Sequence, residues 1–538
     1  MKNLTLIFTL LFLSVLTVRA EEKKAVLDPD AFRHYVEQFN ADDEETVRQA
    51  FPNEKAWEFM RENIPLLDYP DEEIQRTWYF RWWTFRKALK MTANDGWVVT
   101  EFLPKVPWSG KENAISCPAG HHFREGRWLQ NRQILDDYAR FWLYGGGAIR
   151  TYSFWIADSV WQYALVTGDS RLAVSLLDAL IQNYEAWEKS NRDPNGLFWQ
   201  IDGRDGMEVS IGGHGYRATI NTYMYMETLA ISRIAALAGR EELSREYAGK
   251  AAAIQKLLNS RLWDTDAQFY KVAPRVETAD APLALRDVRE EHGFTPWYAD
   301  EGNLPPAEYA VAWDQLMDTK GFYAPFGPTT AEQRHPEFVI SYEGHECQWN
   351  GPSWPYSTAV TLTALANLVN REAQAGDQTQ AEKHRKAFTE TLQIYAHSHQ
   401  RKREDGKVVP WIDENLNPFT GDWIARTRLK DWGWKPQKGG YERGKDYNHS
   451  TFCDVVVNGL IGLRPSLENG LTLFPLVDRG VPYFCLDRVP YHGKNLTILW
   501  DSDGKRYHRG VGLRVLADGV EIYASEQLPE KPVWIPLN

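Results

Sequence analysis

The sequence predicts a mainly α-helical protein that ends in a small antiparallel β region, and three observations support this prediction. Between residues 132 and 400, apolar side chains recur at three- and four-residue spacing, which is the period of amphipathic helices. After residue 465 the chain changes to short, partly alternating, β-branched segments separated by Gly and Asp, which is typical of hairpins. Aromatic residues make up 13% of the chain, enough large apolar rings to exclude intrinsic disorder.

The first twenty residues are expected to be a secretory signal and not part of the fold. Lys2 gives a positive start, residues 4–18 are almost wholly apolar, and residues 18–20 (V-R-A) form a plausible cleavage site. This apolar stretch is too short for a comfortable membrane span, and no later segment offers about twenty uncharged apolar residues. We therefore expect an exported protein, periplasmic or extracellular, with no membrane span.

Residues 21–125 are expected to be a helical and aromatic segment that leads into the main helical region. Residues 80–86 (F-R-W-W-T-F-R) are aromatic and basic, and we interpret them as helix packing because the chain as a whole is acidic. His121, His122 and Glu125 lie close together, but their spacing does not match the H-E-x-x-H zinc signature. We expect that segment to be a loop at the mouth of a pocket.

Residues 126–465 are predicted to form the helical catalytic region. Seven segments carry helical spacing of apolar residues: 132–144, 153–166, 171–190, 216–237, 241–260, 358–370 and 378–400. Gly and Pro cluster between the helices, as in residues 192–196 (R-D-P-N-G) and 324–328 (A-P-F-G-P). The long connectors are aromatic and polar, and loops of that kind on a helical scaffold often form a binding site.

Residues 466–538 are predicted to form a small β-sandwich-like domain. Its strands are expected at 471–477, 496–500, 512–516 and 520–524, with turns at Asp503-Gly504 and Asp518-Gly519. We interpret this region as structural support in preference to an independent sugar-binding module.

The net charge and the cysteine residues limit the classes of function that this protein can have. With 61 basic and 73 acidic residues the net charge is -12, which disfavours binding to the phosphates of nucleic acid. Cys117, Cys347, Cys453 and Cys485 allow three pairings, among which the sequence does not choose. No two of them form a C-x-x-C pair, and no Walker-type or G-x-S-x-G motif occurs. We expect no metal and no cofactor.

Two acidic clusters in aromatic, Gly-rich stretches carry the candidate chemistry. Residues 195–213 place Asp202, Asp205 and Glu208 within seven residues. Residues 410–423 (P-W-I-D-E-N-L-N-P-F-T-G-D-W) place Asp413 and Glu414 beside tryptophan. Glycosidic bond hydrolysis needs two carboxyl groups in different protonation states, and neighbouring apolar rings raise the pKa of the acid by desolvation. The alternative is that these are solvated carboxylates in ordinary turns.

Four motifs resemble a known group of enzymes. Residues 414–421 (E-N-L-N-P-F-T-G) are similar to the E-N-Y-N-P-x-T-G element of the (α/α)₆ glycoside hydrolases related to processing α-glucosidase and mannosylglycerate hydrolase, the family 63-like group. Residues 348–357 (Q-W-N-G-P-S-W-P-Y-S) resemble its Y-W-R-G-P-x-W loop and the Q-W-D-x-P loop of trehalase. Residues 155–161 (W-I-A-D-S-V-W) and 206–210 (G-M-E-V-S) resemble its W-D-S/T and G-M-D-N-S segments. The motifs occur in the family's order.

The resemblance implies an (α/α)₆ toroid, the six-hairpin glycosidase fold, and an inverting mechanism. It makes Glu414 the general base and puts Glu208 at the position of the general acid, where the family has Asp. Asp205, three residues earlier, is the alternative acid. An inverting pair implies carboxyl groups about 6.5–9.5 Å apart.

The same motifs imply a set of sugar-binding residues. Indole rings are expected to stack on the sugar, and polar groups to bind its hydroxyls. The candidates are Trp155, Asp158, Trp199, Arg204, Gln348, Trp349, Asn350, Trp354 and Trp411. For the aromatic members, core packing is the alternative interpretation.

We therefore expect an exported, exo-acting, inverting glycosidase that removes a terminal, α-linked sugar from an oligosaccharide or polysaccharide. One alternative is a polysaccharide lyase on a similar helical toroid. The other is a non-catalytic glycan-binding protein. The sequence indicates neither the sugar nor the oligomeric state.

Overall fold

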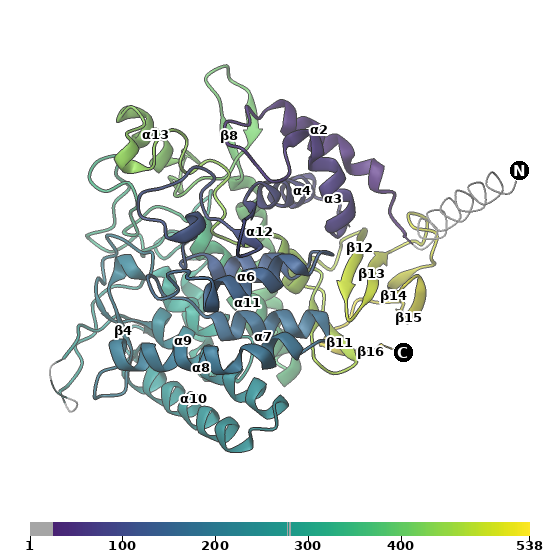
Figure 1. Cartoon of the computed structure of the whole chain (residues 1–538). Helices are drawn as coiled ribbons and strands as arrows, with labels where there is room; N and C mark the ends of the chain where they lie inside the picture. The colour runs from purple at the N-terminus through teal and green to yellow at the C-terminus, as the bar shows by residue number, and fades with distance from the viewer. Residues whose placement is uncertain (1–24, 277, 279–280, 538) are drawn as a thin grey trace, which may run out of the picture.

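The computed structural model describes residues 25–276, 278 and 281–537 (Figure 1). The predicted secretory signal, residues 1–20, lies outside the described residues. Within them, no helix is both long enough and apolar enough to cross a bilayer.

Helices are the main regular structure of the described residues. Their bounds are α2 (Arg33–Ala41), α3 (Ala56–Asn63), α4 (Glu72–Lys87), α5 (Ala119–Gly126), α6 (Gln133–Tyr144), α7 (Ile156–Thr167), α8 (Arg171–Asn191), α9 (Ala218–Leu237), α10 (Glu241–Arg261), α11 (Pro355–Ala375), α12 (Gln378–Ser398), α13 (Ile424–Asp431) and α14 (Cys453–Val455). All seven helices predicted from apolar spacing are present. Helix α11 begins earlier than predicted, because Pro355 occupies its first turn, where a missing N–H costs nothing.

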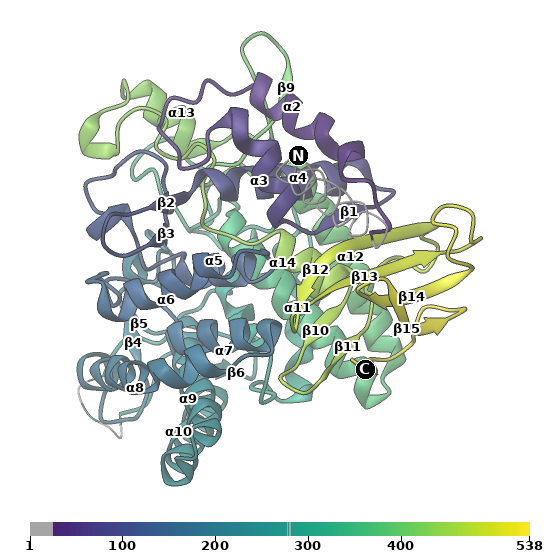
Figure 2. The same cartoon turned by 45° about the vertical axis from the view of Figure 1, so that its right-hand side comes forward.

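The helices form the two layers of an α/α toroid. Helices α5, α7, α9 and α11 are buried on almost every side, whereas α6, α8, α10 and α12 each bury one face. A helix that is buried all round belongs to an inner layer, and a helix with one apolar face belongs to an outer layer. Figures 1 and 2 show α9 and α10 packed side by side, joined by a short link.

The chain is rich in tryptophan, with 23 residues, and most of these rings fill the helical core. The fully buried indoles are Trp78, Trp82, Trp128, Trp155, Trp187, Trp297 and Trp423. Residues 80–86 lie in α4 and are buried, which confirms their interpretation as helix packing. The buried tryptophans are therefore mainly part of the core.

The segment around His121 is a buried helix, so its prediction as a loop at a pocket mouth is wrong. The His122 ring bonds the Tyr138 hydroxyl at 2.9 Å and the Asn448 carbonyl at 2.7 Å. The Glu125 carboxylate accepts from the backbone N–H groups of Cys453 and Asp454 at the start of α14. These polar groups stay inside the core because each of those bonds offsets part of their desolvation.

Short strands flank the helices and form a β region at the C-terminal end. The bounds are β1 (Leu66–Asp68), β2 (Leu89–Met91), β3 (Trp97–Val99), β4 (Trp199–Gln200), β5 (Gly215–Tyr216), β6 (Trp263–Asp264), β7 (Phe269–Tyr270), β8 (Gln400–Lys402), β9 (Val408–Pro410), β10 (Leu463–Pro465), β11 (Gly470–Leu473), β12 (Tyr483–Tyr491), β13 (Lys494–Asp501), β14 (Gly512–Ala517), β15 (Val520–Ser525) and β16 (Val533–Pro536). All pairings between these strands are antiparallel.

The larger sheet combines residues from both ends of the chain. Its order is β1-β12-β13-β14-β15, and a three-stranded sheet, β10-β11-β16, lies nearby (Figure 2). Strand β12 was not predicted, because a bulge between Leu486 and Val489 interrupts its alternation. Strand β1 was not predicted either, because its three residues are recognisable as a strand only from their pairing with β12.

The four cysteines Cys117, Cys347, Cys453 and Cys485 are free thiols. Cys453 and Cys485 are buried in the core, while Cys117 and Cys347 are partly accessible. None of the three possible disulfide pairings is present among these described residues.

Candidate active site

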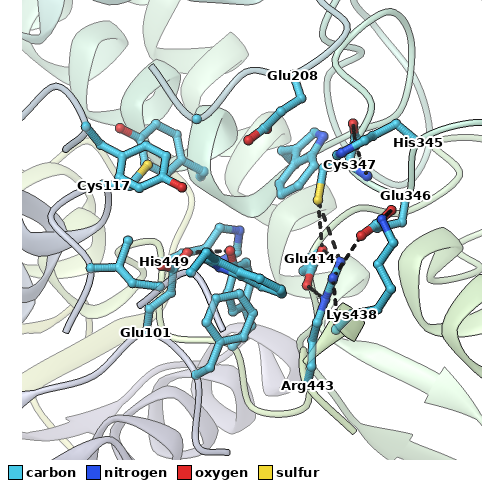
Figure 3. Close-up of a pocket in the computed structure, with 18 of the residues that line it drawn as sticks. Glu101, Cys117, Glu208, His345, Glu346, Cys347, Glu414, Lys438, Arg443 and His449 are labelled. Carbon is cyan, nitrogen blue, oxygen red and sulfur yellow. Dashed lines mark hydrogen bonds and ion pairs between the residues drawn. The ribbon is translucent and has the colours of Figure 1, made fainter. Parts of the chain in front are cut away.

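A cavity of about 240 Å³ lies between loops that the helices hold in place. Its lining comes from six places in the chain: residues 101–117, Tyr152, the 206–208 turn, residues 345–356, Glu414 and residues 437–449. The labelled side chains in Figure 3 surround this space from different loops. The cavity therefore joins the two acidic clusters, which the sequence separates by about two hundred residues.

The turn that carries Glu208 has unusual backbone geometry. Gly206 has φ +74°, and a Cβ there would lie 2.5 Å from the Cys117 sulfur, so glycine is required. Val209 also has a positive φ, 64°, which is strained for a β-branched residue. The Trp349 N–H donates to the Glu208 carbonyl at 3.0 Å, which ties this turn to the 345–356 loop. These constraints place the Glu208 side chain on the cavity wall.

The Glu208 carboxyl is desolvated and keeps its proton near neutral pH. Burial, reinforced by the charges of Glu414 and Asp202, raises its pKa to about 7. Arg443 acts in the opposite direction, but its effect is smaller. Among the described residues no cation forms an ion pair with Glu208. A carboxyl in that state is suited to donate a proton.

Glu414 lines the same cavity in a different electrostatic environment. It lies between β9 and α13 and is 1% exposed. Arg443 donates two hydrogen bonds to it, from Nε to Oε1 at 2.6 Å and from Nη2 to Oε2 at 2.8 Å. The Cys347 thiol donates to Oε2 at 3.2 Å. A two-point guanidinium contact holds the carboxylate in one orientation.

Arg443 also binds a second carboxylate. Its Nη1 donates to Glu346 at 2.9 Å, and Lys438 binds the other oxygen of Glu346 at 3.0 Å. Although burial opposes it, Arg443 and Lys438 lower the pKa of Glu346 to about 2. Gly444, the residue after Arg443, lets the backbone pass close to Asp413, because a Cβ there would lie 1.9 Å from the Asp413 carboxylate. The cations on this side of the cavity are therefore already paired.

Asp205, the alternative acid, lies outside the cavity lining. Its carboxylate pairs with Arg217 at 2.7 Å and accepts bonds from Ser153 at 2.6 Å and from Thr219. The Asp205 and Arg217 side chains are both fully buried. Asp205 thus attaches the Glu208 turn to α9 and has no free oxygen toward the cavity.

Trp349 and Trp354 are the two predicted sugar-binding residues that line the cavity. Their rings stack on each other at 4.8 Å, with an angle of 16° between the planes. The Trp354 indole N–H donates to the Gln348 carbonyl at 2.8 Å. The pair offers an aromatic wall to a ligand.

The other predicted tryptophans pack elsewhere. Trp155 is fully buried and stacks on Tyr223 at 4.3 Å. Trp199 lies under the Arg275 guanidinium at 3.8 Å, and Trp411 lies between the Arg401 and Arg426 guanidinium groups. Core and cation–π packing occupy these rings, which is why none of them lines the cavity.

The predicted polar partners also lie away from the lining. Asp158 pairs with Arg124 at 3.3 Å inside the helical core. The Arg204 guanidinium stacks on Tyr152 at 5.5 Å, and the Gln348 amide donates to two carbonyls of its own loop. Asn350 holds the loop through its backbone carbonyl, which accepts from the Val339 N–H at 3.0 Å. The last three therefore support residues of the cavity wall without being part of it.

Sequence reasoning missed several residues that do line the cavity: Glu101, Cys117, Tyr152, Cys347, Arg443, Tyr447 and His449. The stretch 439–449 (G-G-Y-E-R-G-K-D-Y-N-H) combines glycine, aromatic and charged residues, a signal that could have drawn attention to it. Glu101 follows the apolar strand β3 without any motif. Across the described residues, no group of three or more His, Cys, Asp or Glu side chains is arranged to hold a metal ion.

Comparisons with known proteins identify a family and several similar structures. The family model described as the mannosylglycerate hydrolase MGH1-like glycoside hydrolase domain matches residues 111–450. A solved structure named sialidase is 38% identical over 96% of this chain, with a TM-score of 0.83. This chain spans 45% of that protein's length.

More distant structures resemble this chain less closely. A GH63 mannosylglycerate hydrolase from Thermus thermophilus, in complex with glucose, is 14% identical over 58% of this chain and 75% of its own, with a TM-score of 0.40. An α-L-rhamnosidase from Dictyoglumus thermophilum is 10% identical over 88% of this chain and 49% of its own, with a TM-score of 0.49.

Proposed function

This chain belongs to the mannosylglycerate hydrolase MGH1-like glycoside hydrolases, and from that premise we propose that it removes a terminal sugar with inversion of configuration. In this proposal Glu208 is the general acid and Glu414 is the general base. The observation that carries it is the contrast between the two carboxyls of one cavity: burial raises the pKa of Glu208 to about 7, whereas Arg443 binds both oxygens of Glu414. Glycoside hydrolysis requires that division.

The proposed reaction uses both groups in one step. The Glu208 carboxylic acid donates its proton to the glycosidic oxygen as the bond to the anomeric carbon breaks. The Glu414 carboxylate accepts a proton from a water molecule that attacks the opposite face of the sugar, so the anomeric configuration inverts. Arg443 orients Glu414 for this step. After product release, the proton passes from Glu414 to solvent and Glu208 is reprotonated.

Exo-action is supported by the size of the cavity. At about 240 Å³, with walls from six parts of the chain, it suits one sugar ring better than an internal stretch of polysaccharide. The stacked Trp349 and Trp354 form an aromatic surface for that ring. The E-N-L-N-P-F-T-G resemblance makes an α-linked neutral hexose the first substrate to test.

The sialidase name of the 38% identical structure suggests that a sialoside also be tested. A sialic acid would bring a carboxylate to a cavity where Arg443 and Lys438 already bind Glu414 and Glu346. We therefore expect neutral glycosides to be hydrolysed in preference to anionic ones.

Release of monosaccharide from a panel of α- and β-linked aryl glycosides and oligosaccharides identifies the substrate. Proton NMR of the first-formed anomer then tests inversion, and first-formed product with the substrate's own configuration would contradict the mechanism. Glu414→Gln is expected to abolish turnover without changing the melting temperature, and near-normal activity in that variant would overturn the role of Glu414. Ultraviolet-absorbing unsaturated products would instead indicate a lyase.

We also propose that the protein is exported after removal of its first twenty residues. The positive start and apolar stretch of residues 1–18 support this. N-terminal sequencing of protein recovered outside the cytoplasm is expected to begin at Glu21, and recovery of the uncleaved chain from the cytoplasm alone would contradict export.

A further inference from the structure

Besides Glu208, Glu346 and Glu414, the carboxyl of Glu101 lines the cavity, and it has no part in the proposed mechanism. It follows strand β3 and is 5% exposed. Figure 3 shows it on the same side of the cavity as His449, whereas Glu208 and Glu414 come from other loops. Burying a carboxyl beside two others is costly, so its retention there calls for a functional reason.

The 447–449 loop holds Glu101 in place. The Tyr447 hydroxyl donates a hydrogen bond to Glu101 Oε1. The Asn448 N–H donates to the Glu101 carbonyl at 3.0 Å, and the Asn448 amide donates to the Thr100 carbonyl at 3.2 Å. The backbone and one carboxyl oxygen of Glu101 are thereby engaged. Tyr447 is the only hydrogen-bond donor to its carboxyl among the described residues, which leaves Oε2 for a ligand.

The surroundings of Glu101 favour its neutral form. Burial has the largest effect, and the charge of Glu414, joined by that of Glu208 once Glu208 is ionised, also raises the pKa of Glu101, to about 8. The Tyr447 hydrogen bond and Arg443 act in the opposite direction. With Oε1 accepting from Tyr447, a protonated Oε2 acts as a hydrogen-bond donor.

His449 gives the same wall a second neutral polar group. Its ring lies 3.8 Å from the Tyr447 ring, and the residue is 2% exposed. Among the described residues neither ring nitrogen has a hydrogen-bond partner of good geometry, and the Tyr447 backbone makes only a weak contact with the ring. Burial lowers the pKa of His449 well below its usual value, so the imidazole is neutral. A neutral imidazole has one donor and one acceptor nitrogen, and a sugar hydroxyl satisfies either.

We propose that Glu101 and His449 form a hydroxyl-binding wall that selects an uncharged sugar ring. This inference rests on the proposed function and adds a specificity-determining pair to it. Glu101 donates to a hydroxyl oxygen of the bound sugar, and His449 exchanges a hydrogen bond with a hydroxyl of the same ring. A sugar carboxylate in the same place would have to lie in the same cavity as the Glu414 carboxylate, which disfavours uronic and sialic acids.

The test compares hydroxyl recognition in wild-type enzyme and in Glu101→Ala. With the best neutral substrate and its set of monodeoxy analogues, wild-type enzyme is expected to lose at least tenfold in kcat/KM for one analogue. In Glu101→Ala that penalty is expected to disappear, with KM raised about tenfold for the parent sugar. An undiminished penalty in the variant, or an unchanged KM, would overturn the proposal.

A conservative variant separates binding from proton transfer. Glu101→Gln keeps a neutral donor, so its KM is expected to rise less than that of Glu101→Ala. A loss of kcat as large as that of Glu208→Gln would show that Glu101 transfers a proton, and this too would overturn the proposal. Glu404→Gln, an exposed site near the β8–β9 hairpin, is the matched control with wild-type kinetics.

Binding of the released monosaccharide tests the role of Glu101 and His449 separately from the catalytic roles of Glu208 and Glu414. Calorimetry of the released monosaccharide with wild-type enzyme and with His449→Ala reports recognition without turnover, and weaker binding to the variant is expected. Equal binding by both proteins would count against the wall. If Glu414→Gln retains activity, the catalytic assignment fails while the binding comparison still decides the role of Glu101 and His449.

Discussion

The loops of Glu208 and Glu414 present the same chemical group to one cavity in opposite ways. Glu208 projects from a strained turn into a desolvated position without an ion-pair partner among the described residues, and its pKa rises to about 7. Glu414 is bound through both oxygens by the buried Arg443. The difference shows that surroundings, more than residue type, assign the acid and the base.

The largest expected effect comes from removing the acid and varying the leaving group. Glu208→Gln is expected to lower kcat by about 10²–10⁴-fold on a substrate with a sugar leaving group, because no proton reaches the departing oxygen. On an aryl glycoside with an acidic phenol the loss is expected to be much smaller, since that leaving group departs unprotonated. Glu414→Gln should impair both substrates. Equal losses of Glu208→Gln on both substrates would remove the contrast between the two residues.

The next largest effect is expected when Arg443 is removed. Arg443→Met leaves the buried Glu414 and Glu346 without their shared cation, so the free energy of unfolding is expected to fall by about 3–5 kcal/mol. Turnover is expected to fall by about 10–100-fold, because Glu414 loses its orientation. Denaturant unfolding and steady-state kinetics measure the two quantities.

Arg443→Lys is the matched control for this change. It keeps the charge but not the two-point contact, so intermediate losses are expected. A fully active and fully stable Arg443→Met enzyme would show that Glu414 does not depend on this pairing.

The pH dependence of activity is expected to follow Glu208. The acid must be protonated before it reacts, so kcat/KM is expected to fall as pH rises through about 7 and then to drop about tenfold per pH unit. Burial raises this pKa most, and Glu414, Asp202 and Arg443 are the charged groups that modify it. The falling limb should persist in Glu101→Gln and vanish in Glu208→Gln. Its loss in Glu101→Gln would assign the limb to Glu101 instead.

The smallest effect on turnover is expected for Asp205→Asn. The buried Arg217 loses its partner, so unfolding is expected to become easier by about 3–5 kcal/mol. The pH limb and leaving-group dependence should remain, because Asp205 does not line the cavity. Thermal unfolding and pH–rate profiles check this, and a leaving-group pattern like that of Glu208→Gln would reassign the acid to Asp205.

The helical scaffold was predictable because its pattern is local. Apolar residues at helical spacing identify α6 to α12, and short motifs identify the loops of Glu208 and Glu414. Trp155 was misplaced, because one sequence cannot show whether an indole faces a ligand or stacks on Tyr223. Strand β12 was missed because its bulge breaks the alternation.

The rest of the cavity depends on contacts between segments that are remote in sequence. Glu101 and Tyr447 are separated by 346 residues and meet only in the fold. Nothing in the sequence distinguishes Arg443 from a surface arginine, and only the fold brings it into contact with Glu414. The spacing of residues along the sequence carries no information about such long-range contacts, so cavity residues outside the motifs were not predicted.

The ladder between β1 and β12 has a consequence for synthesis of the chain. Asp68 binds Arg506 at 2.7 Å across 438 residues of sequence, and Leu66 and Leu67 are fully buried beside β12. A ribosome makes β1 several hundred residues before its partner strand β12, so an apolar strand stays unpaired until β12 has been synthesised. The growing chain thus carries an aggregation-prone strand until β12 is made, and truncation before β12 leaves β1 without this partner.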